Sequence, residues 1–177
     1  MRLLTQTFTV LALLTSCFAH ADMTDPTAAQ TLQNEIAQVG LAKFTSSDYK
    51  PGLLKHIVLF HYQDSVTQAQ KDEVKRRFLA LKDLCRRNGR PYILSIQTGS
   101  QNSGEGVDQG LEKGFIVTFK SEGDRNYYVG QPVVTNPAFY EPAHQLFKDF
   151  VKPLLRTPLN PDGVLVFDFK IEAIANY

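Results

Sequence analysis

Hydrophobic and polar positions divide the chain into segments with two different periods. Alternating or short apolar runs predict β-strands, because successive side chains of a strand point to opposite faces. Apolar positions recurring every three or four residues predict helices. The predicted strands cover 54–62, 92–98, 114–120 and 164–169, and the predicted helices cover 67–85, 122–129 and 137–155. The order β-α-β-β-α-α-β predicts an α+β, ferredoxin-like fold with a four-stranded antiparallel sheet.

Local signals support these boundaries. Thr67 and Gln70 have the spacing of a capping box at the start of the first helix of this series. The segment 88–91, Asn-Gly-Arg-Pro, should end that helix. The glycine-rich segment 99–110 lacks phosphate-loop spacing and is interpreted as a hairpin connection. Pro142 either kinks the last helix or marks its true start.

Residues 22–52 form a separate piece, an N-terminal helix and linker. Leu32, Ile36 and Val39 have helical spacing, and Gly40 should stop the helix. The helix either packs on the main domain or holds a tether at a membrane.

The strands are apolar on both faces. In the first strand His56 and Val58 point one way, whereas Ile57 and Leu59 point the other. A sheet with one face in water should alternate apolar and polar residues, so a second cover is needed besides the helices. A second copy of the sheet, which would make a dimeric α/β barrel, is the preferred cover, and the N-terminal helix is the alternative.

Residues 1–21 have the pattern of a signal peptide. Arg2 precedes an apolar run at 8–14, and the segment 19–21, Ala-His-Ala, predicts cleavage before Asp22. The protein should therefore be exported, to a periplasm or to the medium. Two alternatives remain: a lipobox at 14–17, in which Cys17 is lipidated and the protein is a membrane-anchored lipoprotein, and a buried core helix.

Composition narrows the classes of partner. The 177 residues, 43% of them hydrophobic, suit one domain with an appendage. Removing residues 1–21 removes Arg2 and no acidic residue, which leaves equal numbers of basic and acidic side chains. Nucleic acid is therefore a poor candidate partner. Cleavage also leaves Cys85 as a lone cysteine, interpreted as a small buried hydrophobe, and no cysteine cluster for a metal.

Six segments together resemble the stress-responsive A/B barrel (Dabb) domain family. They are 55–60 (Lys-His-Ile-Val-Leu-Phe), 81–84 (Leu-Lys-Asp-Leu), 114–119 (Gly-Phe-Ile-Val-Thr-Phe), 124–128 (Asp-Arg-Asn-Tyr-Tyr), 142–144 (Pro-Ala-His) with Phe147, and 164–169 (Val-Leu-Val-Phe-Asp-Phe). The resemblance covers residues 53–169 and leaves 170–177 as a C-terminal tail. It implies a homodimer whose pocket lies between sheet and helices.

The chain departs from the family pattern at one place. In the family the short tyrosine-containing helix runs almost directly into the Pro-Ala-His segment, whereas residues 129–141 intervene here. This insertion makes the position of Tyr127 or Tyr128 relative to His144 uncertain, and Tyr140 is a candidate replacement.

The resemblance also implies roles for particular residues. His144 would act as an acid/base group assisted by Tyr128, and His56 would line the same ligand pocket with Tyr127 and Tyr140. Imidazole can take and give a proton near neutral pH, and a tyrosine hydroxyl can hold a developing enolate oxygen. Such a site suits proton abstraction beside a carbonyl of a small apolar, aromatic or polyketide-like molecule, with no metal or cofactor.

Structural alternatives accompany each role. His144 could simply pack or cap a helix, and His56 could be a hydrogen-bonded core residue. Asp168 could pair with a base. His61 points to the opposite face from His56, which argues against a three-histidine metal site. The broader superfamily also offers haem ligation by His144 as a minor alternative.

Three functions therefore remain open. The first is an exported homodimer that binds a small apolar or aromatic molecule, with acid/base chemistry at His144. The second is a non-enzymatic envelope protein that acts through assembly or stress protection. The third is a lipoprotein accessory subunit tethered through Cys17. A binder should have a closed pocket holding His144 near a tyrosine hydroxyl, whereas an assembly protein should have that volume filled.

Overall fold

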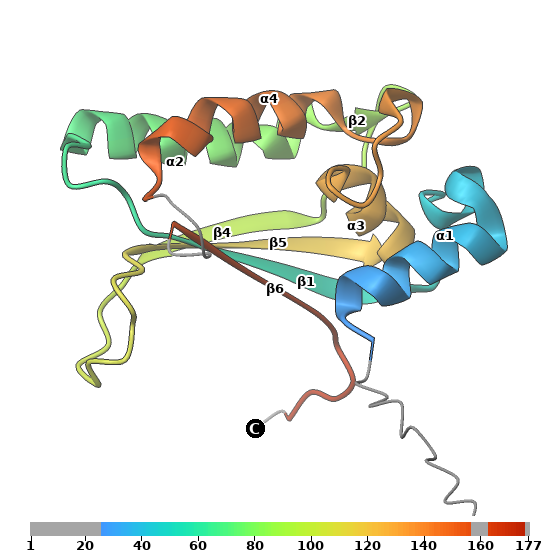
Figure 1. Cartoon of the computed structure of the whole chain (residues 1–177), viewed down its shortest axis with the longest axis horizontal. Coiled ribbons are helices and arrows are strands. Elements are labelled where there is room, and N and C mark those ends of the chain that lie inside the picture. Colours follow the sequence, from blue (N-terminus) through green and yellow to red (C-terminus); the bar gives the residue numbers. More distant parts are fainter. Residues whose placement is uncertain (1–25, 157–162, 176–177) are drawn as a thin grey trace, which may run out of the picture.

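The computed structural model describes residues 26–156 and 163–175. One antiparallel sheet carries helices α2, α3 and α4 on a single side (Figure 1). An N-terminal helix and a very short hairpin, β2–β3, complete the described part. The main elements are α1 (Ala28–Phe44), β1 (Pro51–Phe60), α2 (Gln68–Leu84), β2 (Arg86–Arg87), β3 (Arg90–Pro91), β4 (Ser95–Ser100), β5 (Lys113–Ser121), α3 (Glu122–Val129), α4 (Pro142–Val151) and β6 (Val164–Lys170).

The sheet has the strand order β4-β5-β1-β6, with every neighbouring pair antiparallel. Strand β1 is therefore central. Its His56 lies opposite Val117 of β5 on one side and opposite Asp168 of β6 on the other. This topology confirms the predicted ferredoxin-like α+β fold.

The main hydrophobic core lies between the sheet and helices α2 and α4. It buries Phe60 of β1, Phe78 of α2, Phe115 of β5 and Phe147 of α4, whose rings stack or meet edge to face. Cys85 is fully buried in the same core, and burial raises the pKa of its thiol. The prediction of a small buried hydrophobe at this position is confirmed.

Two boundaries differ from the sequence prediction, although the capping box of Thr67 and Gln70 is confirmed. Helix α2 ends at Leu84, before the segment 88–91, and the second strand begins at Ser95 instead of residue 92. Residues 86–91 form the β2–β3 hairpin, with Asn88 and Gly89 at φ of 51° and 74°. Two central residues with positive φ match the twist of a tight hairpin, so the chain reverses here before the strand can start.

The predicted helix at 137–155 consists of three pieces. A 3₁₀ turn at Pro137–Phe139 precedes α4, and another at Lys152–Leu154 follows it. Pro142 occupies the first turn of α4 and so marks its true start, because proline lacks the N–H that a helix interior requires. Glu141 caps this start by accepting a hydrogen bond from the Ala143 N–H at 3.2 Å.

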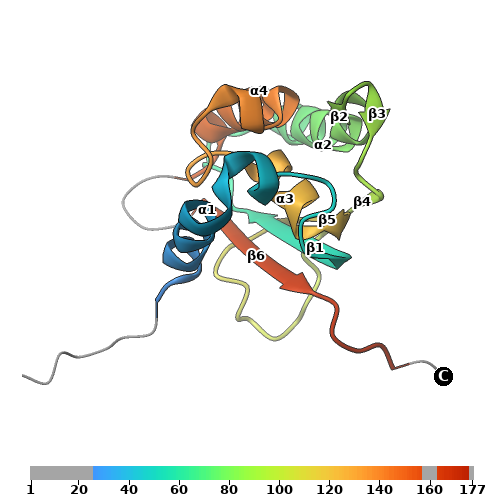
Figure 2. The same cartoon turned by 90° about the vertical axis from the view of Figure 1, so that its right-hand side faces the viewer.

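The N-terminal segment packs on the main domain. Helix α1 bends at Gly40 (φ 77°) and continues to Phe44, beyond the predicted stop. Figure 2 shows α1 beside α3, at the β6 edge of the sheet. Phe44, Tyr49 and Val134 form a second hydrophobic cluster, which joins the N-terminal segment to the segment 129–141.

The second face of the sheet stays open. It presents apolar side chains from three strands: Ile57, Leu59, Ile116, Leu165, Phe167 and Phe169. Phe167 is 58% exposed, and α1 lies at the sheet edge instead of across this face. The alternative in which the N-terminal helix covers the second face is therefore wrong. We refer to these six residues as the open face.

The proposed signal peptide, its cleavage site before Asp22 and the lipidation candidate Cys17 lie outside the described residues. None of the helices in the described part is both long and apolar enough to cross a membrane.

Candidate functional site

His144 lies in the first turn of α4 and points toward α3. Its side chain is buried, with 6% of the residue exposed. The ring Nδ1 lies 2.7 Å from the backbone oxygen of Tyr128. A carbonyl oxygen only accepts hydrogen bonds, so Nδ1 carries the proton and donates it. In the neutral ring Nε2 then keeps its lone pair and is the basic atom.

Tyr128 joins His144 through its ring as well as its backbone. The two rings stack with centroids 3.8 Å apart and planes inclined by 17°. The Tyr128 hydroxyl is buried and has no hydrogen-bond partner among the described residues. Burial, helped by Cys85 and Glu141, raises the pKa of Tyr128 well above its ordinary value, so the hydroxyl stays protonated and can donate.

His56 completes the cluster from the central strand. The β1–β6 register sets it opposite Asp168, and its Nδ1 lies 2.6 Å from Asp168 Oδ1. Asp168 also accepts a hydrogen bond from Arg125 of α3. Burial alone would raise the pKa of Asp168, but the hydrogen bond from His56 and the Arg125 charge outweigh it and hold that pKa below its ordinary value. The expectation that Asp168 pairs with a base is confirmed.

The ring of His56 meets the ring of Tyr128 edge to face, with centroids 5.8 Å apart. An ionised carboxylate only accepts, so the Nδ1 of His56 donates to Asp168. Both histidines thus donate from Nδ1 to a protein acceptor, and their Nε2 atoms have no part in these bonds. The ring of Tyr128 contacts both imidazoles. We call His56, Tyr128 and His144 the histidine cluster.

The other two predicted tyrosines lie apart from this cluster. The Arg87 guanidinium lies over the ring of Tyr127, with its Cζ 4.3 Å from the ring centroid. The same ring meets the ring of Tyr92 edge to face. Tyr140 packs in the second hydrophobic cluster, with its Cβ close to Gly130. Of the tyrosines named from the sequence, the structure brings only Tyr128 to the histidines, because the rotation of α3 turns neighbouring residues to different sides.

Sequence reasoning missed two polar groups near the cluster. One is Arg125, the second partner of Asp168. The other is the buried pair of Tyr92 and Glu141, in which the hydroxyl donates to the carboxylate at 2.9 Å. Glu141 was detectable as a helix cap, since it directly precedes Pro142. Nothing in the local pattern marks the partner of Arg125, which is 43 residues away.

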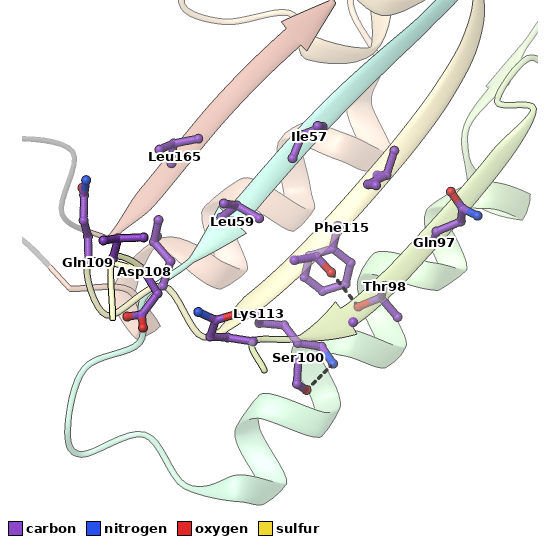
Figure 3. A pocket seen from close by; sticks show the side chains of 16 residues that line it. Ile57, Leu59, Gln97, Thr98, Ser100, Asp108, Gln109, Lys113, Phe115 and Leu165 are labelled. Atoms are coloured by element: carbon purple, nitrogen blue, oxygen red, sulfur yellow. Dashed lines mark hydrogen bonds between the residues drawn. The ribbon is translucent and has the colours of Figure 1, made fainter. Parts of the chain in front are cut away.

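Two hollows lie on the surface away from the histidine cluster. A concavity of about 690 Å³ lies on the open face beside the 101–112 loop. Figure 3 shows Leu59 and Leu165 side by side at its floor, with Asp108 and Gln109 of the loop at its rim. A second hollow, of about 430 Å³, is lined by His61 and Arg156. Neither hollow is lined by a residue of the histidine cluster.

Metal-binding geometry is missing from the part of the chain that the structure describes. No group of three or more His, Cys, Asp or Glu side chains there could hold a metal ion. His61 lies at the far end of β1 and packs against Gly110, away from His56.

The family model of the stress responsive A/B barrel domain matches residues 54–171. The chain belongs to this family. No curated protein matches it. The match begins after α1, so the N-terminal helix is an addition to the family domain, whereas the histidine cluster lies within it.

Solved structures give the same fold. An Arabidopsis thaliana protein, At3g17210, is 24% identical, with 70% of this chain and 99% of that chain covered and a TM-score of 0.53. A hydroxynitrile lyase from Passiflora edulis is 20% identical, with 71% and 99% covered and a TM-score of 0.53. A dimeric ferredoxin-like protein of unknown function from Jannaschia sp. is 20% identical, with 68% and 100% covered and a TM-score of 0.49. At these identities the similarity shows the fold alone.

The burial of His144 predicts a pH-dependent stability. Burial, with the charges of Lys148 and His56, lowers the pKa of His144 well below its ordinary value, despite the hydrogen bond to Tyr128. Below about pH 6.5 the unfolded chain binds a proton that the folded chain does not, so stability should fall as the pH falls, by up to about 1.4 kcal/mol per pH unit.

Urea unfolding of the wild type and His144→Gln at pH 7.5 and 5.5 measures this pH dependence of the free energy of unfolding. The advantage of the wild type should shrink by about 1 kcal/mol at the lower pH, and equal pH dependence in both proteins would contradict the assignment.

Proposed function

We propose that the protein is an exported homodimer that assembles through the open face and binds a small apolar or aromatic molecule at the histidine cluster. The observation that carries the assembly is the run of exposed Leu165, Phe167 and Phe169 on β6, continuous with Ile57 and Leu59 of β1. Contiguous exposed apolar area of this kind marks an interaction surface. A second copy presents the same surface and so matches it in size and chemistry.

The Tyr128 hydroxyl supports the ligand site. A buried hydroxyl without a partner costs about 1–3 kcal/mol, which a ligand oxygen would offset. The Nε2 atom of His144 is the matching proton acceptor. A molecule with a carbonyl or hydroxyl group in an apolar frame would complete these contacts. Because His144 is buried, the ligand would displace part of the packing around it.

Proton transfer would follow from the same geometry. His144 is neutral and its Nε2 is the basic atom, so it would take a proton from the bound molecule. Tyr128 would donate a hydrogen bond to the oxygen on which negative charge develops. Asp168 would hold His56 in one orientation.

A second function, assembly or stress protection without a ligand, is favoured by the packing of His144. The bond from its Nδ1 to Tyr128 O joins α4 to α3, and the stacked rings fill the space between these helices. A histidine of this kind could serve stability alone. The two functions differ in what His144→Gln should change.

Assembly is tested by a charge on the open face. Phe167→Asp should convert a dimer to a monomer, because a carboxylate buried in an apolar interface costs several kcal/mol. Size-exclusion chromatography with light scattering gives the mass. Leu146→Asp is the matched control, since Leu146 is 70% exposed on α4, on the helix side, and should leave the dimer intact. A monomeric wild type at micromolar concentration would refute the proposal.

Mandelonitrile tests the chemistry of the cluster, a probe suggested by the hydroxynitrile lyase fold. Removal of its hydroxyl proton by His144 lets the C–C bond break, which gives benzaldehyde and a cyanide ion that takes up the proton. His144→Gln should lower kcat/KM for benzaldehyde release by about 100-fold or more, and Leu146→Ala should not change it. If the wild type neither releases nor binds benzaldehyde by NMR, catalysis on this molecule class is excluded and the assembly function stands.

Export is tested by the N-terminus of the mature chain. Expression of the full chain in a Gram-negative host, followed by fractionation and N-terminal sequencing, should give a soluble envelope protein that begins at Asp22. A membrane-bound product that becomes soluble on Cys17→Ser would instead establish the lipoprotein. An uncleaved cytoplasmic product would contradict both routes.

A further inference from the structure

A continuous path of hydrogen bonds leads from the N-terminal helix to the histidine cluster. The backbone oxygen of Phe44, at the end of α1, accepts from Asn126 Nδ2 at 2.9 Å. Asn126 Oδ1 accepts from Arg125 Nε, also at 2.9 Å. Arg125 then donates through its other arm to Asp168, which holds His56. Four hydrogen bonds thus connect α1, α3, β6 and β1.

The path is shielded from water along most of its length. Phe44, Asn126 and His56 are buried, and the side chain of Arg125 is only 11% exposed. Charge-assisted hydrogen bonds in such surroundings are stronger and more directional than those at a surface. A displacement of Phe44 at one end of the path should therefore change the hydrogen bonding of His56 at the other.

The N-terminal segment is held closely against α3. Two N–H groups at the start of this helix donate to the segment, from Glu122 to Lys50 O and from Gly123 to Tyr49 O. Gly123 has no space for a side chain, because a Cβ there would lie 1.8 Å from the oxygen of Ser46. Such close contact places Arg125 and Asn126, one turn further along α3, at a defined distance from the end of α1.

Arg125 bonds to one carboxylate and acts on a second through its charge. Asp168 accepts its hydrogen bond, and Glu35 of α1 lies close enough for the Arg125 charge to act on it. Lys50 shares Glu35 with Tyr49, and His56 faces Asp168 from β1. The guanidinium is oriented from the α1 side through Asn126, which bonds to Phe44 O, and from the sheet through Asp168.

We propose that Arg125 and Asn126 are positioning residues of the histidine cluster, and that the docked N-terminal helix is the element that holds them. Through Arg125 the helix sets the orientation of Asp168, and Asp168 in turn keeps the proton of His56 on Nδ1. A segment outside the matched family domain is thus part of the site. The inference rests on the proposed function only for what the cluster does, not for the coupling itself.

NMR of the full folded chain, without any ligand, tests the coupling. Carboxyl ¹³C shifts report the titration of Asp168, and ring ¹⁵N shifts report which nitrogen of His56 carries the proton. Arg125→Gln should raise the pKa of Asp168 by about one pH unit, because a cation that favours the carboxylate is lost. Asn126→Ala should move it in the same direction by a smaller amount. Arg125→Lys, which keeps the charge but not the two-armed geometry, should restore part of the shift.

Arg87→Gln is the matched control. Arg87 forms an ion pair with Asp124 of the same helix at 3.0 Å, and Asp124 is fully buried, but this pair is not on the path. The control should lose stability without moving the Asp168 or His56 signals. If Arg87→Gln and Arg125→Gln shift the Asp168 and His56 signals equally, the effect comes from a general loss of stability and the inference is overturned.

The role of α1 needs a variant that undocks it. Ile36→Asp places a charge against the second hydrophobic cluster, at a residue of α1 that makes none of the hydrogen bonds of the path. It should move the Asp168 titration in the direction of Asn126→Ala. If Arg125→Gln moves the signals and Ile36→Asp does not, the helix has no part in positioning. If Asn126→Ala does not fold, Arg125→Gln and Ile36→Asp decide the question. Because no ligand is used, failure of the mandelonitrile assay leaves this test unaffected.

Discussion

Strand β1 lies at the centre of the sheet, and its pairing register decides what each face presents. His56, Val58 and Phe60 point to the helices, whereas Ile57 and Leu59 point to the open face. A slip of one residue against β5 or β6 would exchange these sets, because the side-chain period of a strand is two. The same register brings Asp168 opposite His56. The apolar open face and the pairing of the buried His56 with Asp168 are therefore two results of one alignment.

The histidine cluster shows how polar rings can be kept in an apolar core. Each imidazole donates a hydrogen bond from Nδ1 to a protein acceptor. The acceptor is a backbone oxygen for His144 and a carboxylate for His56. Stacking on Tyr128 removes the remaining freedom of the His144 ring. Such satisfied groups cost little to bury, while the unpartnered Tyr128 hydroxyl is the point where a ligand would gain most. The contacts that hold the His144 ring in place are therefore the same ones that leave its Nε2 as the basic atom.

Helix α1 lies before the matched family domain and packs against a segment within that domain. Helix α1 and the segment 129–141 share the cluster of Phe44, Tyr49 and Val134, on the α3 side of the domain. Apolar side chains of the two segments cover one another in this cluster. The cluster lies next to α3, which carries Tyr128 and Arg125. A helix outside the matched family domain thus packs beside the helix that contacts both histidines.

Local pattern in the sequence determined the element order, the cap at Thr67 and the apolar character of both sheet faces. These features depend on residues close together in the chain, through period, propensity and capping. Only the tertiary structure decided that Tyr128, and not Tyr127 or Tyr140, meets His144, and that Arg125 reaches Asp168. Those contacts join residues 16 and 43 positions apart, and they depend on the rotation of α3 against the sheet and on the docking of α1. No local pattern encodes them, because packing of the whole core fixes such rotations.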